Sequence, residues 1–236
     1  KQNTSGRGNL SITSINLPRI GIKHGIILNN KIDLDSFFKE LEEKLDLVKD
    51  QLLERFDIQC SKKVFNFPFL LKQGLWMDGE KLKNTDSLKK VLKHGTMSIG
   101  FTGLAECLKA LVGKHHGESK EAQKLGIKIV AFMREKCDQY SGKYNLNFNL
   151  IATPAGNLTS ELIKMDQAIY GKLKEVTDKK IYTDSFHIPI NFKIEPKKKI
   201  EIEAPYHELT NGGHITEINL EYTPTKKEFM ELLDFM

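Results

Sequence analysis

The sequence lacks the features that would direct the chain into a membrane or through one. No hydrophobic run approaches the roughly 18 consecutive apolar residues that a membrane-spanning helix requires. The chain starts Lys-Gln-Asn-Thr-Ser-Gly, which is polar and contains no apolar core of a secretory signal. We therefore expect a soluble protein of the cytoplasm that has no membrane partner.

Cysteine is also scarce, with three residues in the whole chain: Cys60, Cys107 and Cys137. No two of them have the Cys-x-x-Cys spacing of a zinc or redox motif, so we expect no metal site in this chain. Such a sparse, odd set is typical of a reducing compartment. Cys107 has apolar neighbours and is expected in the core, whereas Cys60 follows a predicted helix and is expected to be exposed.

Neither sign of charge dominates. The 236 residues include 36 Lys and Arg against 31 Asp and Glu, a net charge of +5, and the one basic block is Lys197-Lys198-Lys199. Nucleic-acid binding usually needs a concentrated basic face, so we expect no nucleic-acid partner. A composition with 39% hydrophobic and 28% charged residues is that of a globular protein. The first residue is not methionine, which indicates a processed chain or a piece of a longer protein.

Two long amphipathic helices are the clearest predicted elements. Apolar residues recur every three or four positions over residues 33–56, with Asp33 as the N-cap, and again from about Ser119 to Cys137. Shorter helices are predicted over 86–94 and 104–112, and a Thr225…Glu228 capping box precedes a C-terminal helix. Strands are predicted over 10–17, 97–103 and 147–152.

Strand-like runs continue near the end of the sequence, over residues 181–190, 200–203 and 214–222. Strands that alternate with helices predict an α/β sheet with crossover connections. There is no internal repeat and no interdomain linker, so residues 1–236 are interpreted as one domain or one part of a larger domain.

The segment 152–160, Ala-Thr-Pro-Ala-Gly-Asn-Leu-Thr-Ser, is the best candidate binding site. Its small residues allow close approach of a ligand to the backbone, and the start of the following helix offers unpaired N–H groups that suit a phosphate. The hydroxyls of Thr153, Thr159 and Ser160 add possible donors. The alternative interpretation is an ordinary turn in which Ser160 is the helix N-cap.

Other candidate sites have weaker signals. The segment 98–103 is rich in glycine but matches neither phosphate-loop motif, so close packing of a strand on a helix explains it. His207, Glu208 and His214 could be metal ligands, but Gly212-Gly213 breaks any helix that would fix their geometry. His115 and His116 lie in a connection that is expected to be solvated, and His187 is expected to be buried with a partner. No nucleophilic triad or carboxylate pair can be assembled.

Seven short motifs in a fixed order resemble one enzyme family. They are Gly-Arg-Gly-Asn-Leu at 6–10, Ile-Asn-Leu-Pro-Arg-Ile at 15–20, Ser-Ile-Gly-Phe-Thr-Gly-Leu-Ala-Glu at 98–106, Lys-His-His-Gly-Glu-Ser at 114–119, Ala-Thr-Pro-Ala at 152–155, Thr-Asp-Ser-Phe-His at 183–187 and Asn-Gly-Gly-His-Ile at 211–215. Together they resemble the anaerobic (class III, oxygen-independent) ribonucleoside-triphosphate reductases, which are glycyl-radical enzymes. The resemblance extends from Gly6 to about Tyr222.

This resemblance implies the fold and its limits. The family's catalytic subunit is a ten-stranded α/β barrel, and residues 1–236 resemble the later half of it. The N-terminal nucleotide-sensing domain, the finger-loop radical cysteine, the four-cysteine zinc site and the glycyl-radical segment are expected outside this sequence. No residue of the chain is therefore expected to be catalytic, and none of its cysteines lies in a radical-cysteine context.

The resemblance also implies where substrate binds. The turn at 152–160 matches the loop whose backbone N–H groups hold substrate phosphates. The substrate-binding residues implied there are Thr153, Pro154, Ala155, Gly156, Asn157, Leu158, Thr159 and Ser160. The sequence departs from its relatives at Ala155-Gly156-Asn157, where many carry an acidic residue. Asn9, in preference to Asn16, corresponds to an asparagine near the ribose.

The implied activity is reduction of ribonucleoside triphosphates to deoxyribonucleoside triphosphates for DNA synthesis. The implied chemistry uses a glycyl radical and a thiyl radical that abstracts the 3′-hydrogen, with zinc in the parent protein and formate as reductant. Implied partners are a radical S-adenosylmethionine activating enzyme, a second copy of the chain in a homodimer, and ATP and dNTP effectors. The alternatives are another glycyl-radical enzyme of the pyruvate formate-lyase kind, or a non-catalytic nucleotide-binding scaffold.

Overall fold

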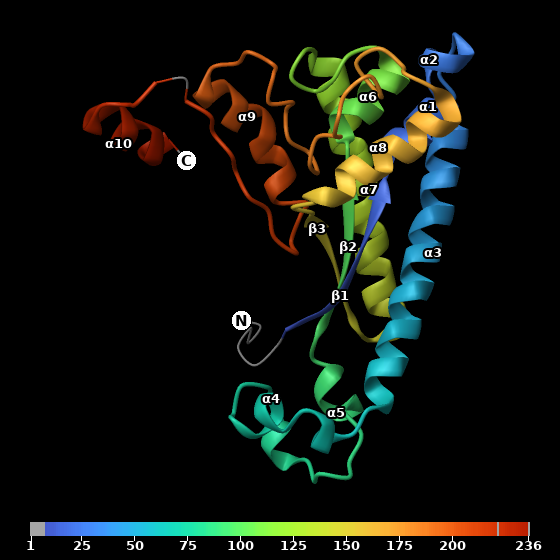
Figure 1. The fold of residues 1–236 in the computed structure, drawn as a ribbon, viewed down its shortest axis with the longest axis vertical. Coiled ribbons are helices and arrows are strands. Elements are labelled where there is room, and N and C mark those ends of the chain that lie inside the picture. The colour runs from blue at the N-terminus through green and yellow to red at the C-terminus, as the bar shows by residue number, and fades with distance from the viewer. Residues whose placement is uncertain (1–7, 221, 236) are drawn as a thin grey trace.

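Three parallel strands organise the chain. A computed structural model describes residues 8–220 and 222–235, so Gly6 and Arg7 of the first motif lie outside the described residues. The strands β1 (Asn9–Asn16), β2 (Thr96–Thr102) and β3 (Asn147–Ala152) lie in the order β1-β2-β3, and both neighbouring pairs are parallel (Figure 1). The three predicted strands and the α/β character are confirmed. Because the strands are parallel, their carboxyl ends meet at one edge of the sheet.

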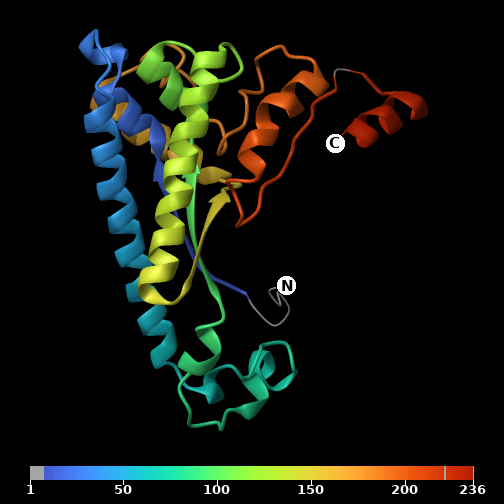
Figure 2. The same cartoon turned by 180° about the vertical axis from the view of Figure 1, so that it is seen from behind.

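Two long crossover helices cover one face of this sheet. Helix α3 (Leu34–Ser61) packs on β1 and α7 (Lys120–Tyr144) packs on β3, and Figure 2 shows both on the same side. The predicted caps are present, because Asp33 accepts a hydrogen bond from the Ser36 N–H and Ser119 accepts one from the Ala122 N–H. Helix α3 ends at Ser61, beyond the predicted end.

The core lies between the sheet and these helices. Buried side chains from all five elements form it, among them Ile15, Leu41, Leu45, Ile99, Phe101, Ile129, Met133 and Leu150. Cys107 is buried as predicted. The expectation that Cys60 is exposed is wrong, because the last turn of α3 still faces the core and leaves Cys60 6% exposed. Burial also raises the pKa of the Cys60 thiol, which makes it a poor nucleophile.

Short helices surround the carboxyl edge of the sheet. They are α1 (Leu17–His24), α2 (Ile26–Asn29), α6 (Leu104–Val112) and α8 (Asn157–Tyr170). Helix α6 has the predicted bounds, and it packs against α1. Pro18 directly follows the strand predicted over residues 10–17 and lies in the first turn of α1, where its missing N–H costs nothing.

A small lobe lies at the opposite end of the sheet (Figure 1). It contains the short helices η1 (Val64–Asn66), α4 (Pro68–Lys72), η2 (Gly79–Lys81) and α5 (Lys89–Leu92). The helix predicted over residues 86–94 is therefore limited to one turn. None of the described helices combines the length and the apolar character needed to cross a membrane.

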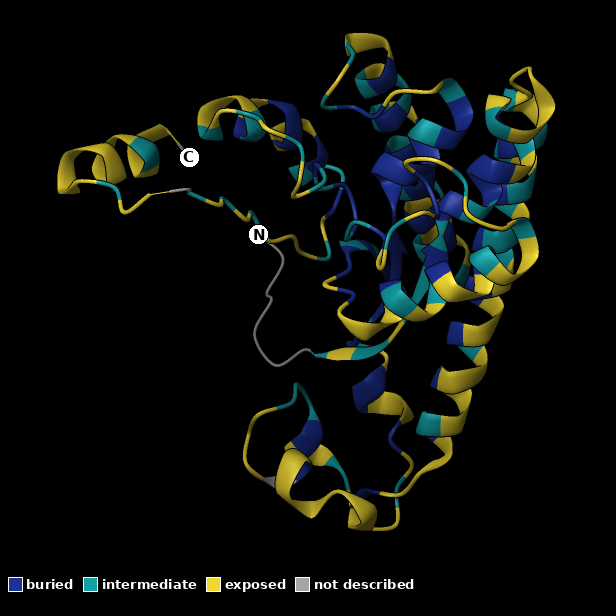
Figure 3. Ribbon diagram, turned by 45° about the horizontal axis from the view of Figure 1, so that its top comes forward, coloured by how far each residue is buried: buried dark blue, intermediate teal, exposed yellow. Residues whose placement is uncertain are grey.

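The strands predicted for the last third of the chain are wrong. Residues 200–203 lie inside helix α9 (Pro196–His207), and 181–190 and 214–220 have no regular strand. The run at 181–190 is fixed by hydrogen bonds to buried carboxylates instead of a ladder, as described below. Helix α10 (Lys226–Phe235) confirms the predicted capping box, since the Thr225 and Glu228 backbone N–H groups each donate to the other's side chain. Figure 3 shows that α10 is mostly exposed.

Candidate functional site

The predicted phosphate turn lies at the carboxyl edge of the sheet. Residues 153–156 leave β3 there, and the strand register places this point beside Thr102 of β2 and Asn16 of β1. In open parallel sheets, ligands bind outside the carboxyl ends of the strands. The fold therefore presents the turn at the edge where binding is expected.

Thr153 anchors the turn to the sheet on the face opposite the two long helices. Its Oγ1 forms a hydrogen bond of 2.9 Å with Ser14 Oγ, which crosses above Gly100 of β2. A Cβ on Gly100 would lie 2.0 Å from Thr153 Oγ1, so no larger residue fits without moving the turn. This contact explains why residue 100 is a glycine, but its neighbours are the turn and β1, whereas the helix packing expected for the 98–103 segment is found at Gly103, where a Cβ would lie 2.3 Å from Pro18 of α1.

The segment Asn211–Gly213 fixes the outer side of β3 and the start of the turn. Leu150 N–H donates to Asn211 Oδ1 at 3.1 Å, and Gly212 N–H donates to the Leu150 carbonyl at 2.8 Å. Ala152 N–H then donates to the Gly213 carbonyl at 3.0 Å. The Asn-Gly-Gly motif therefore forms hydrogen bonds with the outer side of β3. Within the described residues, no group of three or more His, Cys, Asp or Glu could hold a metal.

The start of α8 supplies amides that suit an anion. Gly156 is the N-cap with φ of +47°, a conformation that favours glycine. The amides of Gly156 and Asn157 have no acceptor in the part of the chain that the structure describes, whereas Leu158 N–H donates to the Ala155 carbonyl at 2.8 Å. Free N–H groups at the positive end of a helix are typical of phosphate sites.

The hydroxyls of the turn are not available in the way the sequence predicted. Thr159 is buried, and its Oγ1 donates to the Gly156 carbonyl at 3.0 Å. Ser160 Oγ donates to the Asn157 carbonyl at 2.8 Å. Ser160 lies inside the first turn of the helix, so its interpretation as the N-cap is wrong. Pro154 and Leu158 are exposed beside these amides.

A carboxylate already contacts this turn. Asp184 Oδ2 accepts a hydrogen bond of 3.2 Å from the Ala155 N–H, and Asp184 bridges to Thr102 of β2. Burial raises the pKa of Asp184, although the hydrogen bond from Ala155 opposes that shift. Sequence reasoning did not single out Asp184, and the signal available to it was the Thr-Asp-Ser-Phe-His motif alone.

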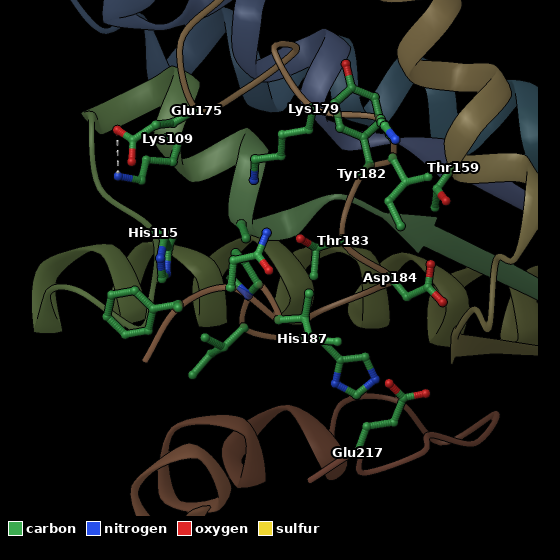
Figure 4. A pocket seen from close by; sticks show the side chains of 18 of the residues that line it. Lys109, His115, Thr159, Glu175, Lys179, Tyr182, Thr183, Asp184, His187 and Glu217 are labelled. Atoms are coloured by element: carbon green, nitrogen blue, oxygen red, sulfur yellow. Dashed lines mark hydrogen bonds and ion pairs between the residues drawn. The ribbon is translucent and has the colours of Figure 1, made fainter. Parts of the chain in front are cut away.

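A cavity of about 750 Å³ opens beside the turn (Figure 4). Gly156, Thr159 and Asp184 form one part of its wall, and His187 and Glu217 lie next to Asp184. Four lysines line the rest of it: Lys109, Lys179, Lys180 and Lys199. Pockets of this size commonly hold small ligands.

Three of these lysines have acidic partners, and one of them is Lys199, whose Nζ lies 3.6 Å from Glu203 Oε1. Lys109 Nζ lies 2.9 Å from Glu118 and 3.2 Å from Glu175, and Lys179 Nζ lies 2.8 Å from Glu106 Oε1. Glu106 is fully buried and also accepts hydrogen bonds from the backbone N–H and the hydroxyl of Thr183. The segment 179–183 is thus attached to α6 through one carboxylate.

A second buried carboxylate joins α8 to the end of β1. Asp166 accepts hydrogen bonds from Asn16 Nδ2 at 2.8 Å, Arg19 Nε at 2.6 Å and Tyr182 Oη at 2.8 Å. Its side chain has no exposed surface. This network fixes the helix whose N-terminus forms the turn, and it was not visible from the sequence.

The histidines are more buried than the sequence predicted. His115 and His116 are 3% and 1% exposed, so the expectation of a solvated pair is wrong. Their rings pack against Phe192 and Tyr206, respectively. His187 is mostly buried, and its Nδ1 lies 3.4 Å from Glu203, the partner that the sequence interpretation required.

The two candidate asparagines occupy different ends of β1. Asn16 lies beside the turn, but its side chain is used: Oδ1 caps α1, and Nδ2 donates to Asp166. Asn9 is exposed and lies at the amino end of β1. The separation along the strand is about 23 Å at the usual rise per residue. The structure therefore does not bring Asn9 together with the turn, and its role near a ribose stays a prediction.

Comparison with known proteins identifies the family. The family described as anaerobic ribonucleoside-triphosphate reductase matches residues 1–236. The anaerobic ribonucleoside-triphosphate reductase of Salmonella typhimurium is 37% identical over 213 residues, which cover 89% of this chain. The chain belongs to the anaerobic ribonucleoside-triphosphate reductase family. The phage T4 reductase is 34% identical over 91% of the chain.

The reductase fold is also found among solved structures. A Thermotoga maritima anaerobic ribonucleotide reductase with MES in its active site matches with a TM-score of 0.74 at 20% identity, over 98% of this chain and 36% of that one. A complex of the Thermotoga reductase with dATP and CTP matches with a TM-score of 0.71. The chain spans 29% of the Salmonella protein and 34% of the T4 protein.

Proposed function

We propose that this chain is the substrate-side part of an anaerobic ribonucleoside-triphosphate reductase, and that its turn at 153–160 holds the substrate phosphates. The observation that carries this proposal is the pair of free amides of Gly156 and Asn157 at the N-terminus of α8, in a chain that belongs to this family. Substrate binding there would orient the ribose and reduce a bimolecular encounter to a unimolecular step.

The activity proposed for the intact protein is reduction of ribonucleoside triphosphates to deoxyribonucleoside triphosphates. A glycyl radical and its thiyl partner would supply the one-electron chemistry. We propose that both lie outside this sequence, because the three cysteines here are buried in the core and Cys107 is fully enclosed. Burial raises the pKa of Cys107, so this thiol stays protonated and is a poor nucleophile.

Zinc does not fit the residues of this chain. A four-cysteine site needs thiolates that converge, whereas Cys60, Cys107 and Cys137 do not, and no other described group could hold a metal. We propose that the zinc site of the parent protein is also outside this sequence. We also propose that the intact protein forms a ten-stranded barrel, to which this chain contributes the three strands β1, β2 and β3.

The partners proposed for the intact protein follow from its family. They are a radical S-adenosylmethionine activating enzyme, a second copy of the chain, formate as reductant, and ATP and dNTP effectors. The Thermotoga complex with dATP and CTP supports nucleotides as ligands of this fold. The activity in DNA precursor synthesis supports a cytoplasmic location.

Titration of the intact protein with CTP tests the phosphate turn. Gly156→Pro removes one free amide and cannot adopt the φ of +47° found there. We expect CTP to bind at least tenfold more weakly, because a phosphate loses both a donor and the geometry of its neighbours. Gly156→Ala, which keeps the amide but strains the backbone, should weaken binding less.

The matched control is Gly142→Ala in the exposed part of α7, where an added Cβ meets nothing within 4 Å. Its CTP affinity should equal that of the natural protein. Circular dichroism shows whether each variant is folded. If folded Gly156→Pro and Gly156→Ala both bind CTP as tightly as the control, the phosphate assignment is wrong.

A further inference from the structure

Asp184 occupies an amide that an anionic ligand would use. The carboxylate accepts from Ala155 N–H, the residue immediately before the two free amides of Gly156 and Asn157. Asp184 and Gly156 also line the same cavity, so a ligand in that cavity could reach both the carboxylate and the turn. Figure 4 shows the Asp184 side chain in the cavity wall. Like a phosphate oxygen, a carboxylate oxygen is a negatively charged acceptor for a backbone N–H.

Among the described residues no lysine or arginine pairs with this carboxylate, although the charge of neighbouring His187 acts to lower the Asp184 pKa. Within the described residues, Asp184 forms no ion pair, in contrast to Glu106 and Glu203, which both have a lysine partner. Glu217 lies beside it in the cavity wall and adds negative charge. A half-buried carboxylate without a lysine or arginine partner is held mainly by its N–H donor, so a stronger acceptor for that N–H can displace it.

The tether gives Asp184 an advantage over weak anions. Because the carboxylate is part of the chain, its effective concentration at the Ala155 amide is high, and an anion that uses only this amide competes poorly. A phosphate group has several oxygens and can engage the amides of Ala155, Gly156 and Asn157 together. Only the multidentate ligand gains enough to displace the carboxylate.

We propose that Asp184 is a specificity-determining residue of the phosphate turn, which admits ligands that engage several amides at once and excludes anions that engage one. This inference rests on the proposed function, because it concerns the same turn. On binding, the Asp184 carboxylate leaves the Ala155 N–H, and a phosphate oxygen replaces it. No covalent bond is formed or broken in this exchange.

Inorganic tripolyphosphate and acetate are the probes that test this inference in the intact protein. Asp184→Asn removes the charge but keeps an acceptor, and Asp184→Ala removes both. We expect both variants to bind tripolyphosphate roughly tenfold more tightly, because a like charge and a tethered competitor are removed. Asp57→Asn, an exposed residue of α3, is the charge-matched control and should leave the affinity unchanged.

Acetate distinguishes a competing role from a merely structural one. In Asp184→Ala, acetate should occupy the vacated Ala155 amide and compete with tripolyphosphate, whereas in the natural protein it should not. If Asp184→Asn and Asp184→Ala bind tripolyphosphate no more tightly than the control, or if acetate never competes, the inference is wrong.

The proposed function fails in a different way. If Gly156→Pro leaves tripolyphosphate binding unchanged, the turn is not the phosphate site and both ideas are overturned. If Gly156→Pro weakens binding while Asp184→Asn has no effect, the phosphate turn stands and only the role of Asp184 is refuted.

Discussion

The two halves of this chain are stabilised in different ways. In residues 9–152, periodic apolar side chains pack between a parallel sheet and two crossover helices. In residues 153–220, irregular segments are attached by buried carboxylates: Asp166 and Glu203 of that half, and Glu106 from α6, all fully buried. The first half forms the sheet and its carboxyl edge, and the second half forms the turn and most of the cavity wall at that edge.

This difference decides what a mutation does. An apolar truncation in the first half leaves a cavity, whose cost depends on how well neighbours relax. Removal of a carboxylate in the second half leaves several donors buried without an acceptor, which costs more than the bond itself was worth. Substitutions of both kinds therefore test the comparison.

The largest effect is expected at Asp166. Asp166→Ala leaves Arg19, Asn16 and Tyr182 without their shared acceptor, and we expect a loss of roughly 3–5 kcal/mol in the free energy of unfolding. Urea unfolding followed by circular dichroism measures it. The control is Glu161 on the same helix, whose ion pair is with exposed Lys164, and Glu161→Ala should cost less than about 1 kcal/mol. Equal losses of stability at both positions would show that the hydrogen bonds to Asp166 do not stabilise the fold.

Leu45→Ala probes the apolar half. Leu45 is fully buried on α3, and its truncation should cost about 3 kcal/mol, the middle of the range for buried leucines. Leu47, two residues along and 53% exposed, provides the control, since Leu47→Ala should change stability by less than about 0.5 kcal/mol. The same urea titration compares them, and similar losses at both positions would contradict the assigned face of the helix.

Gly100→Ala tests the contact between the two parts of the chain, because Gly100 lies in the first part and Thr153 in the second. The new methyl group would overlap Thr153 Oγ1, and we expect a loss of about 1–3 kcal/mol together with weaker CTP binding, because the turn must move. The double variant Gly100→Ala, Thr153→Ala removes the overlapping atom, so it should recover part of the stability. If the second substitution only adds to the loss, Thr153 does not lie over Gly100.

The smallest effect is a pH dependence of stability. Burial, with a smaller contribution from neighbouring His115, lowers the pKa of His116 to about 3. The folded state then binds fewer protons than the unfolded state below the unfolded pKa of about 6.5, so stability falls as pH falls. Between pH 7 and 5.5 the loss should be about 1 kcal/mol. His116→Phe should flatten this slope, and an unchanged slope would contradict it.

The apolar half could be predicted from sequence because its signals are local. The helices α3, α6 and α7 follow from the 3.6-residue period and their caps, and β3 from alternation before a turn. The wrong strands at 181–190 and 200–203 have different causes. In the first segment, Tyr182 and Thr183 donate to the buried carboxylates of Asp166 and Glu106 instead of to a neighbouring strand. In the second, the alternation covers only four residues of helix α9, whose Glu203 accepts from the Ile188 N–H at 2.9 Å.

The candidate site was predictable only in part, because only some of its signals are local in the sequence. Small residues between a strand and a helix indicated the turn at 153–156, and the family resemblance predicted that it binds the substrate phosphates. The Asp184–Ala155 hydrogen bond and the Asp166 network join residues far apart in the sequence, and no spacing rule connects them. Ser160 was misassigned because the N-cap of the helix, Gly156, lies four residues before it.

A structure of the intact protein with a bound ribonucleoside triphosphate tests the central claim most directly. We expect phosphate oxygens within hydrogen-bond distance of the Gly156 and Asn157 amides, with the Asp184 carboxylate withdrawn from Ala155. A triphosphate bound elsewhere in the barrel, with both amides free and the Asp184–Ala155 hydrogen bond intact, would contradict the account.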